Sequence, residues 1–321
     1  MDQHATPAWW NERRRGHTVR IARSDPEFTV ELFAATGAQP GPTLAVLAGV
    51  HGDEYEGPVA IGELLAALDH RALAGTLLAV PVVNPPAFAA GTRASSLDGL
   101  NLARCFPGDP AGSASQRLAA LLDREVIAAA DALIDLHSGG VAFAMALLAG
   151  YCDLGDVVSA RSGELARAFG APVLWIHPEG APGRTLSAAQ ARGIPSLYTE
   201  AAGGGGAPEP VVRCYREGVL RVMQQLGMLP GGPVPPRHRE TWRGAGNTDQ
   251  AIAAHAAGLF HPLVQTGDAV AAGQPLGEIR GYDGALVERI AAPAAGVVAM
   301  IRRVPRVVAG DGISLLTRRS E

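Results

Sequence analysis

The sequence predicts an α/β protein with a mixed, mostly parallel sheet flanked by helices, followed by a small all-β domain. Strand-length apolar runs alternate with amphipathic stretches between about residues 28 and 228. A segment rich in Pro and Gly follows, and the rest of the chain carries short strand signals separated by Gly and Pro. With 321 residues, of which 47% are hydrophobic and 18% charged, the chain is large enough to bury a sizeable core.

The first part contains five apolar runs with the length of buried strands, at residues 43–50, 76–83, 132–136, 173–176 and 196–199. Helix-like segments lie between or after them, including residues 57–68, 115–130 and 210–226. This alternation predicts parallel strands covered by helices on both faces. Open sheets of this kind bind their ligands beyond the carboxyl ends of the strands.

The segment PGGPVPP at residues 230–236 cannot continue a helix and is typical of an interdomain linker. Beyond it the strand signals are HPLVQTGDAV, QPLGEI and APAAGVVAM. We therefore predict an α/β domain over residues 1–235 and a small β domain over residues 236–321.

Composition excludes several classes of function. A net charge of −4 argues against a nucleic-acid-binding face. The three cysteines are scattered and show no paired spacing, which fits a reducing compartment and no thiolate zinc site. The N-terminus lacks the apolar core of a signal peptide, and the longest apolar run, residues 141–150, is about half a membrane span. We expect a soluble cytoplasmic protein without a membrane partner.

The strongest local signal is GVHGDEYEG at residues 49–57, directly after a predicted strand. His51 and Glu54 are three residues apart, so a turn that begins there can direct both side chains to one point. Zinc favours such nitrogen and carboxylate ligands, and a catalytic site uses three protein ligands and one open position. The alternative is an exposed turn that carries these residues by chance.

A second strand, ALIDL, runs into His137, which is a natural third ligand at the strand's carboxyl end. Asp135 lies on the same face of that strand and could accept the imidazole N–H. The alternative is a core histidine with ordinary hydrogen bonds. Together, the two strand-end motifs favour a metal site at His51, Glu54 and His137.

A third strand ends in Glu200 and is followed by AAGGGG. A carboxylate beside a zinc-bound water can take its proton and deliver it to a leaving nitrogen. The loop at residues 92–108 adds Arg93, Asn101 and Arg104, and an arginine could bind a substrate carboxylate or polarise an acyl oxygen. The alternatives are a solvent-facing Glu200 and surface arginines without specific contacts.

These motifs, GVHGDEYEG, NLARCFPGDP, DLHSGG and YTEAAGGG, resemble the succinylglutamate desuccinylase/aspartoacylase family of zinc carboxypeptidase-like enzymes. The resemblance spans about residues 40–321 and follows the family's order. It implies one Zn²⁺ per chain held by His51, Glu54 and His137, with Glu200 as general base and acid. It also implies that Arg104 assists the acyl carbonyl or a substrate carboxylate.

The implied reaction is removal of an acetyl or succinyl group from a small N-acylated amino acid by attack of zinc-bound water. Family members commonly have Asn directly before the arginine, where this chain has Ala103, so an N-acetylated diamino acid becomes a candidate substrate. Asn101, two residues before Ala103, and Arg93 are candidate substrate ligands. The alternative functions are a zinc carboxypeptidase for short peptides and a metal-binding or sensing protein without turnover.

The C-terminal part resembles the barrel-sandwich fold of biotinyl and lipoyl carriers, which need a lysine for attachment. All 27 basic residues of this chain are arginines, so a carrier role is excluded. The domain is instead expected to be a lid, a wall of the cleft or an assembly surface. The alternative is an appendage that only stabilises the fold, and a homo-oligomer is left open.

Overall fold

The protein is described by a computed structural model that covers residues 7–320. The prediction about a signal peptide concerns an N-terminus of which residues 1–6 lie outside the described part. Among the described residues, no helix is both long and apolar enough to cross a membrane.

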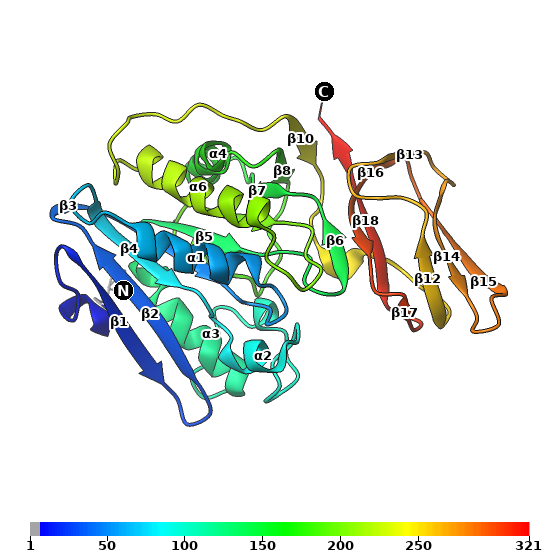
Figure 1. Ribbon diagram of the computed structural model, residues 1–321, viewed down its shortest axis with the longest axis horizontal. Coiled ribbons are helices and arrows are strands. Elements are labelled where there is room, and N and C mark those ends of the chain that lie inside the picture. Colours follow the sequence, from blue (N-terminus) through cyan, green and yellow to red (C-terminus); the bar gives the residue numbers. More distant parts are fainter. Residues whose placement is uncertain (1–6, 321) are drawn as a thin grey trace.

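The α/β prediction is confirmed (Figure 1). The central sheet runs in the order β1-β2-β4-β3-β5-β9-β7-β8-β10. Its parallel core consists of β4, β3, β5 and β9, while β1, β2 and β7 join by antiparallel pairs. In chain order these strands are β1 (His17–Ser24), β2 (Thr29–Thr36), β3 (Gln39–Ala48), β4 (Ala74–Val80), β5 (Ala132–Leu136), β7 (Leu148–Cys152), β8 (Val173–His177), β9 (Ser196–Glu200) and β10 (Glu240–Arg243).

Helices cover both faces of this sheet, as Figure 1 shows. One face packs against α1 (Glu56–Ala67), α4 (Val157–Phe169) and α6 (Glu209–Gln225). The other packs against α3 (Ala114–Glu125) and α5 (Thr185–Ala191), and the short α2 (Pro85–Ala90) follows β4. Because each face has its own buried apolar cluster, the strands between them are hydrophobic on both sides, as the continuous apolar runs predicted.

The expected helix at residues 115–130 is shorter in the structure. It ends at Glu125, and a separate 3-10 turn, η3 (Ile127–Ala129), follows. The indole Nε1 of Trp9 donates to the carbonyl of Glu125 at 2.6 Å, so the helix end is bound by a residue far away in the chain. The remaining 3-10 turns are η1 (Ala8–Asn11), η2 (Leu102–Arg104) and η4 (Thr248–Gln250).

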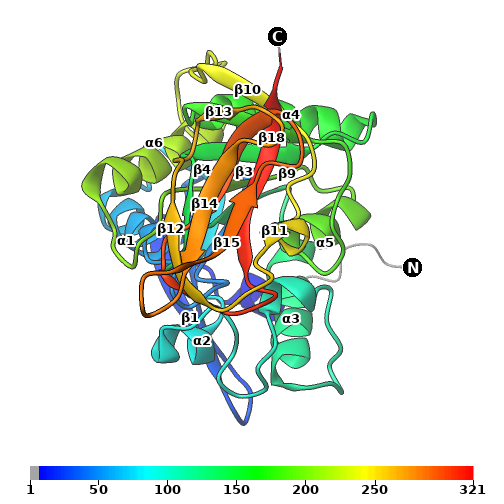
Figure 2. The ribbon, with the colours of Figure 1, turned by 90° about the vertical axis from the view of Figure 1, so that its right-hand side faces the viewer.

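The C-terminal strands form two facing sheets, which appear in front of the α/β body in Figure 2. One sheet has the order β15-β14-β12-β17, and the other contains β18, β16 and β13 with β11 and β6 at its side. The strands are β6 (Phe143–Met145), β11 (Ile252–Ala253), β12 (Gly258–Pro262), β13 (Ala269–Val270), β14 (Pro275–Arg280), β15 (Leu286–Ala291), β16 (Gly296–Arg302), β17 (Arg306–Val307) and β18 (Gly312–Arg319).

The second of these sheets is continuous with the central one. β10 pairs with β8 on one side and with β18 on the other, and β6, which precedes β7, pairs with β16. The segment at residues 230–236 contains no helix or strand, as expected, but β10 beyond it extends the central sheet. The domain boundary at residue 235 stays a prediction, and the C-terminal strands are joined to the central sheet through the pairs β10–β18 and β6–β16.

Candidate metal centre and substrate cavity

Three adjacent parallel strands carry the predicted catalytic groups at their carboxyl ends. His51 follows β3, His137 follows β5, and Glu200 is the last residue of β9. Gly57 in the first turn of α1 allows the close packing that this requires. A Cβ at Gly57 would lie 2.8 Å from the Cβ of Ala48 and 2.9 Å from that of Leu136, the last residues of β3 and β5.

The loops after β3 and β5 are bound to each other by the acidic residues of the first motif. The backbone N–H of Ser138 donates to Glu54 Oε2 at 3.0 Å, and its hydroxyl donates to Glu56 Oε2 at 2.7 Å. The backbone N–H of Val141 donates to Asp53 Oδ2 at 2.9 Å. The three carboxylates of this motif thus fix the loop that carries His137 relative to the loop that carries His51.

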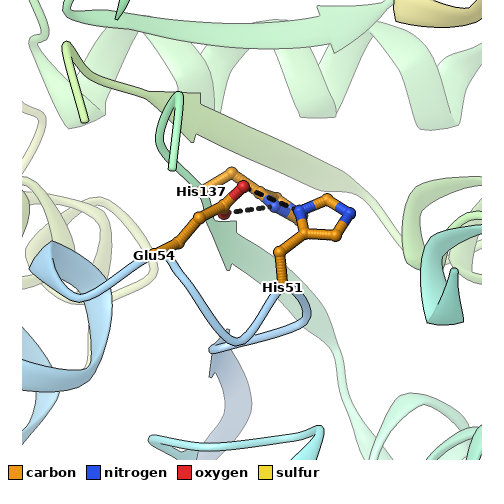
Figure 3. Close-up of side chains that lie close together, drawn as sticks. All are labelled: His51, Glu54 and His137. Atoms are coloured by element: carbon orange, nitrogen blue, oxygen red, sulfur yellow. Dashed lines mark hydrogen bonds and ion pairs between the residues drawn. The ribbon is translucent and has the colours of Figure 1, made fainter. Parts of the chain in front are cut away.

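His51, Glu54 and His137 converge on one point (Figure 3). The Glu54 carboxylate lies between the imidazoles, with Oε1 at 2.7 Å from His51 Nδ1 and Oε2 at 3.0 Å from His137 Nδ1. One potential ligand atom from each of the three residues lies within 4.8 Å of the other two. All three side chains are almost completely shielded from solvent.

Hydrogen bonds on the far side of each ring decide which nitrogen carries the proton. Asn101 Oδ1 accepts from the backbone N–H of Ala103 at 3.0 Å, which identifies this atom as the amide oxygen. The same oxygen lies 3.1 Å from His51 Nε2, so that nitrogen is the donor. His137 Nε2 lies 3.1 Å from Asp135 Oδ2, at ion-pair distance, and this carboxylate favours a proton on Nε2. In the neutral rings, both Nδ1 atoms therefore present lone pairs to the Glu54 carboxylate.

The Nδ1 lone pairs of the two imidazoles and the negatively charged carboxylate oxygens repel one another unless a cation lies among them. In the metal-free chain a proton supplies that charge. Burial disfavours the charged form of His137, but the carboxylates of Asp135 and Glu54 outweigh this and raise its pKa well above the usual value. Burial and the charge of Arg93 lower the pKa of His51. Burial alone would raise the pKa of Glu54, but the two imidazoles lower it. This nitrogen and carboxylate set fits a zinc ion, whose binding would release the proton of His137.

Glu200 lines the same cavity and is free to act on a bound molecule. Its Oε2 is buried and has no hydrogen-bond partner among the described residues. Burial, together with the nearby charge of Glu54, raises the pKa of Glu200 to about 8. A carboxyl group of this pKa can both take up and release a proton near neutrality.

The two predicted arginines have different surroundings. Arg93 Nη1 lies 3.3 Å from His51 Nδ1 and 3.4 Å from Glu54 Oε1, so Arg93 adjoins the metal centre. Arg104 donates from Nε and Nη2 to the carboxylate of Asp249, at 2.8 and 2.7 Å. Both arginines line the cavity, whereas the side chain of Asn101 orients His51 and caps η2. The roles of Asn101, Arg93 and Arg104 towards substrate stay predictions.

The cavity has a volume of about 570 Å³ and extends from the candidate metal centre to a wall made by residues 245–248 and 250. Arg184, which the sequence did not single out, lines it and donates from Nη2 to Asn247 Oδ1 at 2.8 Å. Arg184 Nε is buried without a partner among the described residues. Its neighbours Asn247 and Asp249 belong to the C-terminal segment. No local sequence motif therefore indicated that Arg184, Asn247 and Asp249 lie together.

A buried His–Tyr pair completes the wall. His177 Nδ1 donates to the carbonyl of Gly244 at 2.8 Å, and Nε2 accepts from the Tyr198 hydroxyl at 2.8 Å. Burial lowers the pKa of His177 to about 4, so the ring is neutral. A signal for both residues was present in the sequence: His177 directly follows the strand predicted at residues 173–176, and Tyr198 is two residues before Glu200 on the same strand face.

Comparisons with known proteins agree with this geometry. The family model of the succinylglutamate desuccinylase/aspartoacylase catalytic domain matches residues 40–226. The chain is 31% identical over 282 residues to N-alpha-acetyl-L-2,4-diaminobutyric acid deacetylase of Halomonas elongata, covering 86% of this chain and 82% of the relative.

Solved structures show the same similarity over nearly the whole chain. A succinylglutamate desuccinylase from Silicibacter sp. TM1040 is 27% identical with a TM-score of 0.85, over 94% of both chains. The product-bound ectoine utilization protein EutE (DoeB) from Ruegeria pomeroyi is 29% identical with a TM-score of 0.83, also over 94% of both chains.

Proposed function

Because the chain belongs to the succinylglutamate desuccinylase/aspartoacylase family, we propose that it is a zinc-dependent hydrolase that removes an acyl group from a small N-acylated amino acid. One observation carries the proposal: potential ligand atoms of His51, Glu54 and His137 lie within 4.8 Å of one another beside a cavity of about 570 Å³. His51, Glu54 and His137 would hold the zinc ion.

A zinc ion held by these three residues would supply Lewis-acid chemistry, lowering the pKa of a water and polarising the amide carbonyl. The remaining work falls to side chains of the chain. Glu200 takes the proton of the attacking water and delivers it to the departing nitrogen, for which its raised pKa is suited. Asp135 and Asn101 hold the imidazoles in the tautomer that presents Nδ1. The guanidinium group of an arginine that lines the cavity stabilises the negative charge that develops on the acyl oxygen.

The wall formed by residues 245–250 supports a small substrate over an extended peptide, because it lies across the cavity and binds both Arg104 and Arg184. The relative from Halomonas elongata is named for an N-acetylated diamino acid. An N-acetyl amino acid is therefore the first substrate to examine.

The test is an amine-release screen with the zinc-loaded protein over N-acetyl, N-succinyl and N-formyl amino acids, with tri- and tetrapeptides as controls. The proposal predicts selective release of amine from one group of N-acyl amino acids. Preferred cleavage of the peptides would instead indicate a carboxypeptidase. Stoichiometric zinc without release from any compound would indicate a metal-binding or sensing protein.

A further inference from the structure

The three arginines of the cavity are bound by partners of different charge. Arg184 is held by the neutral amide of Asn247, and Arg93 adjoins the buried Glu54 of the metal centre. Arg104, in contrast, is held by the carboxylate of Asp249, 145 residues further along the chain. Asn247 and Asp249 both belong to residues 245–250, here called the rim segment.

Asp249 uses the two guanidinium positions that Arg104 would offer to a substrate carboxylate. Nε and Nη2 donate to the two oxygens of Asp249, and Nη1 donates to the carbonyl of Ala103 at 2.9 Å. A planar guanidinium grips a carboxylate by two parallel bonds of this kind. A carboxylate of the substrate could take the same positions only by displacing Asp249.

Asp249 carries its charge at neutral pH. The hydrogen bonds from Arg104 lower the pKa of its carboxyl group below the usual value, with further contributions from the charges of Arg104, Arg184 and Arg93. Its side chain is 57% exposed and that of Arg104 is 27% exposed, so the pair stands at the solvent-facing rim. Pairs in such positions contribute little to folding stability, about 0–1 kcal/mol.

We propose that Asp249 is a specificity-determining residue that acts as a fixed counter-carboxylate to Arg104 and so selects N-acyl amino acids with one carboxylate over those with two. The inference rests on the proposed function. A side-chain carboxylate that approached Arg104 would meet the like charge of Asp249, whereas a neutral or cationic side chain would not. The substrates expected to be favoured are therefore N-acyl amino acids with a neutral or ammonium-bearing side chain.

The sharpest test compares two substrates that differ only at the end of the side chain, N-acetyl-2,4-diaminobutyrate and N-acetylglutamate. We expect Asp249→Asn to shift the ratio of their kcat/KM values towards N-acetylglutamate by about tenfold or more, because the amide leaves Arg104 uncompensated. Asn247 accepts a hydrogen bond from Arg184, so an amide can hold an arginine at this rim, and the Asp249→Asn variant should fold.

Two controls separate this inference from a general effect of charge. Glu179→Gln also removes one carboxylate charge, at a residue that lines the cavity. No ion pair joins Glu179 to an arginine among the described residues, so a shift below twofold is expected. In an Arg104→Gln background, Asp249→Asn should no longer change the ratio. A shift of equal size in Glu179→Gln, or an undiminished shift without Arg104, would contradict the inference.

Binding provides a readout that does not depend on turnover. Calorimetry with zinc-loaded protein in a Glu200→Gln background measures N-acetylglutamate binding with and without Asp249→Asn, and at least tenfold tighter binding is expected. If neither binding nor the kcat/KM ratio responds, Asp249 is only a structural contact and the inference is wrong. If binding tightens but the protein with Glu200 intact cleaves no N-acyl amino acid, the proposed function is wrong, and Asp249 excludes a second carboxylate from the cavity without selecting among substrates.

Discussion

The metal-ligand cluster and the rim segment face the same cavity but are constructed differently. His51, Glu54 and His137 are nearly inaccessible to solvent, and short loops bound to each other by carboxylates hold them. The rim segment is anchored to the α/β body by one amide contact and one partly exposed ion pair. Because a partly exposed ion pair contributes little to stability, we expect substitutions in the rim segment to be tolerated more easily than substitutions in the candidate metal-ligand cluster.

The largest expected effect tests the role of Glu200 on the metal side. Glu200→Gln should reduce turnover by about 10²–10⁴-fold, because the amide cannot carry the proton from water to the leaving nitrogen. The measurement is kcat with the zinc-loaded variant, with zinc content determined on the same sample. A variant that binds zinc and keeps more than a tenth of the turnover would refute the assignment.

The same variant gives a second readout through stability. The pKa of Glu200 is raised from 4.5 to about 8 in the metal-free fold, so the unfolded chain loses this proton at lower pH than the folded chain does. The free energy of unfolding of the metal-free parent should therefore fall, relative to Glu200→Gln, as the pH rises from 4.5 to about 8. A constant difference over this range would mean that Glu200 is not held in its protonated form.

A smaller pH dependence of the free energy of unfolding, with the opposite sign, is expected from His177. The pKa of His177 is lowered from 6.5 to about 4, so the unfolded chain binds this proton first as the pH falls. Between pH 6.5 and 4 the parent should lose on the order of 3 kcal/mol of unfolding free energy that His177→Gln does not lose. Denaturant unfolding at several pH values measures this, and parallel pH profiles of the two proteins would contradict it.

The smallest expected effect is a change in zinc affinity on substitution of Asp135, the residue that orients His137. Asp135→Asn removes the charge opposite His137 Nε2 but keeps an acceptor there. We expect zinc affinity to fall by about 10–100-fold with the fold intact, as is typical for such orienting partners. Competition with a fluorescent zinc chelator gives the affinity, and an unchanged value would show that the Asp135–His137 contact has no effect on the metal.

The difference between the ligand cluster and the rim segment also explains which part of the site could be predicted from the sequence. The convergence of His51, Glu54 and His137 could be predicted because each follows a short apolar strand, and the carboxyl ends of adjacent parallel strands meet at one edge. Arg184, Asn247 and Asp249 could not be predicted in this way. Their contacts join segments 63 and 145 residues apart, and no local pattern indicates that an arginine in one loop meets a particular acid in another.

The strands likewise divide into those that the sequence predicted and those that it did not. Strands buried on both faces, such as β3 and β5, are continuous apolar runs and were predicted to within a few residues. The hairpin of β1 and β2 and the short β10 were not predicted. β1 has only one fully buried residue and therefore lacks a continuous apolar run, and β10 has only four residues after a Pro-rich segment. Their places depend on tertiary pairing with β4 and β8.

The most direct test of the central claim is zinc dependence measured on matched samples. The parent protein is depleted with a chelator, titrated with zinc and assayed for amine release from N-acetyl-2,4-diaminobutyrate, alongside His137→Ala. We expect activity to return in proportion to zinc up to one ion per chain, and His137→Ala neither to retain zinc at that stoichiometry nor to recover activity. Full activity in the depleted protein, or one tightly bound zinc per chain in His137→Ala, would contradict the account.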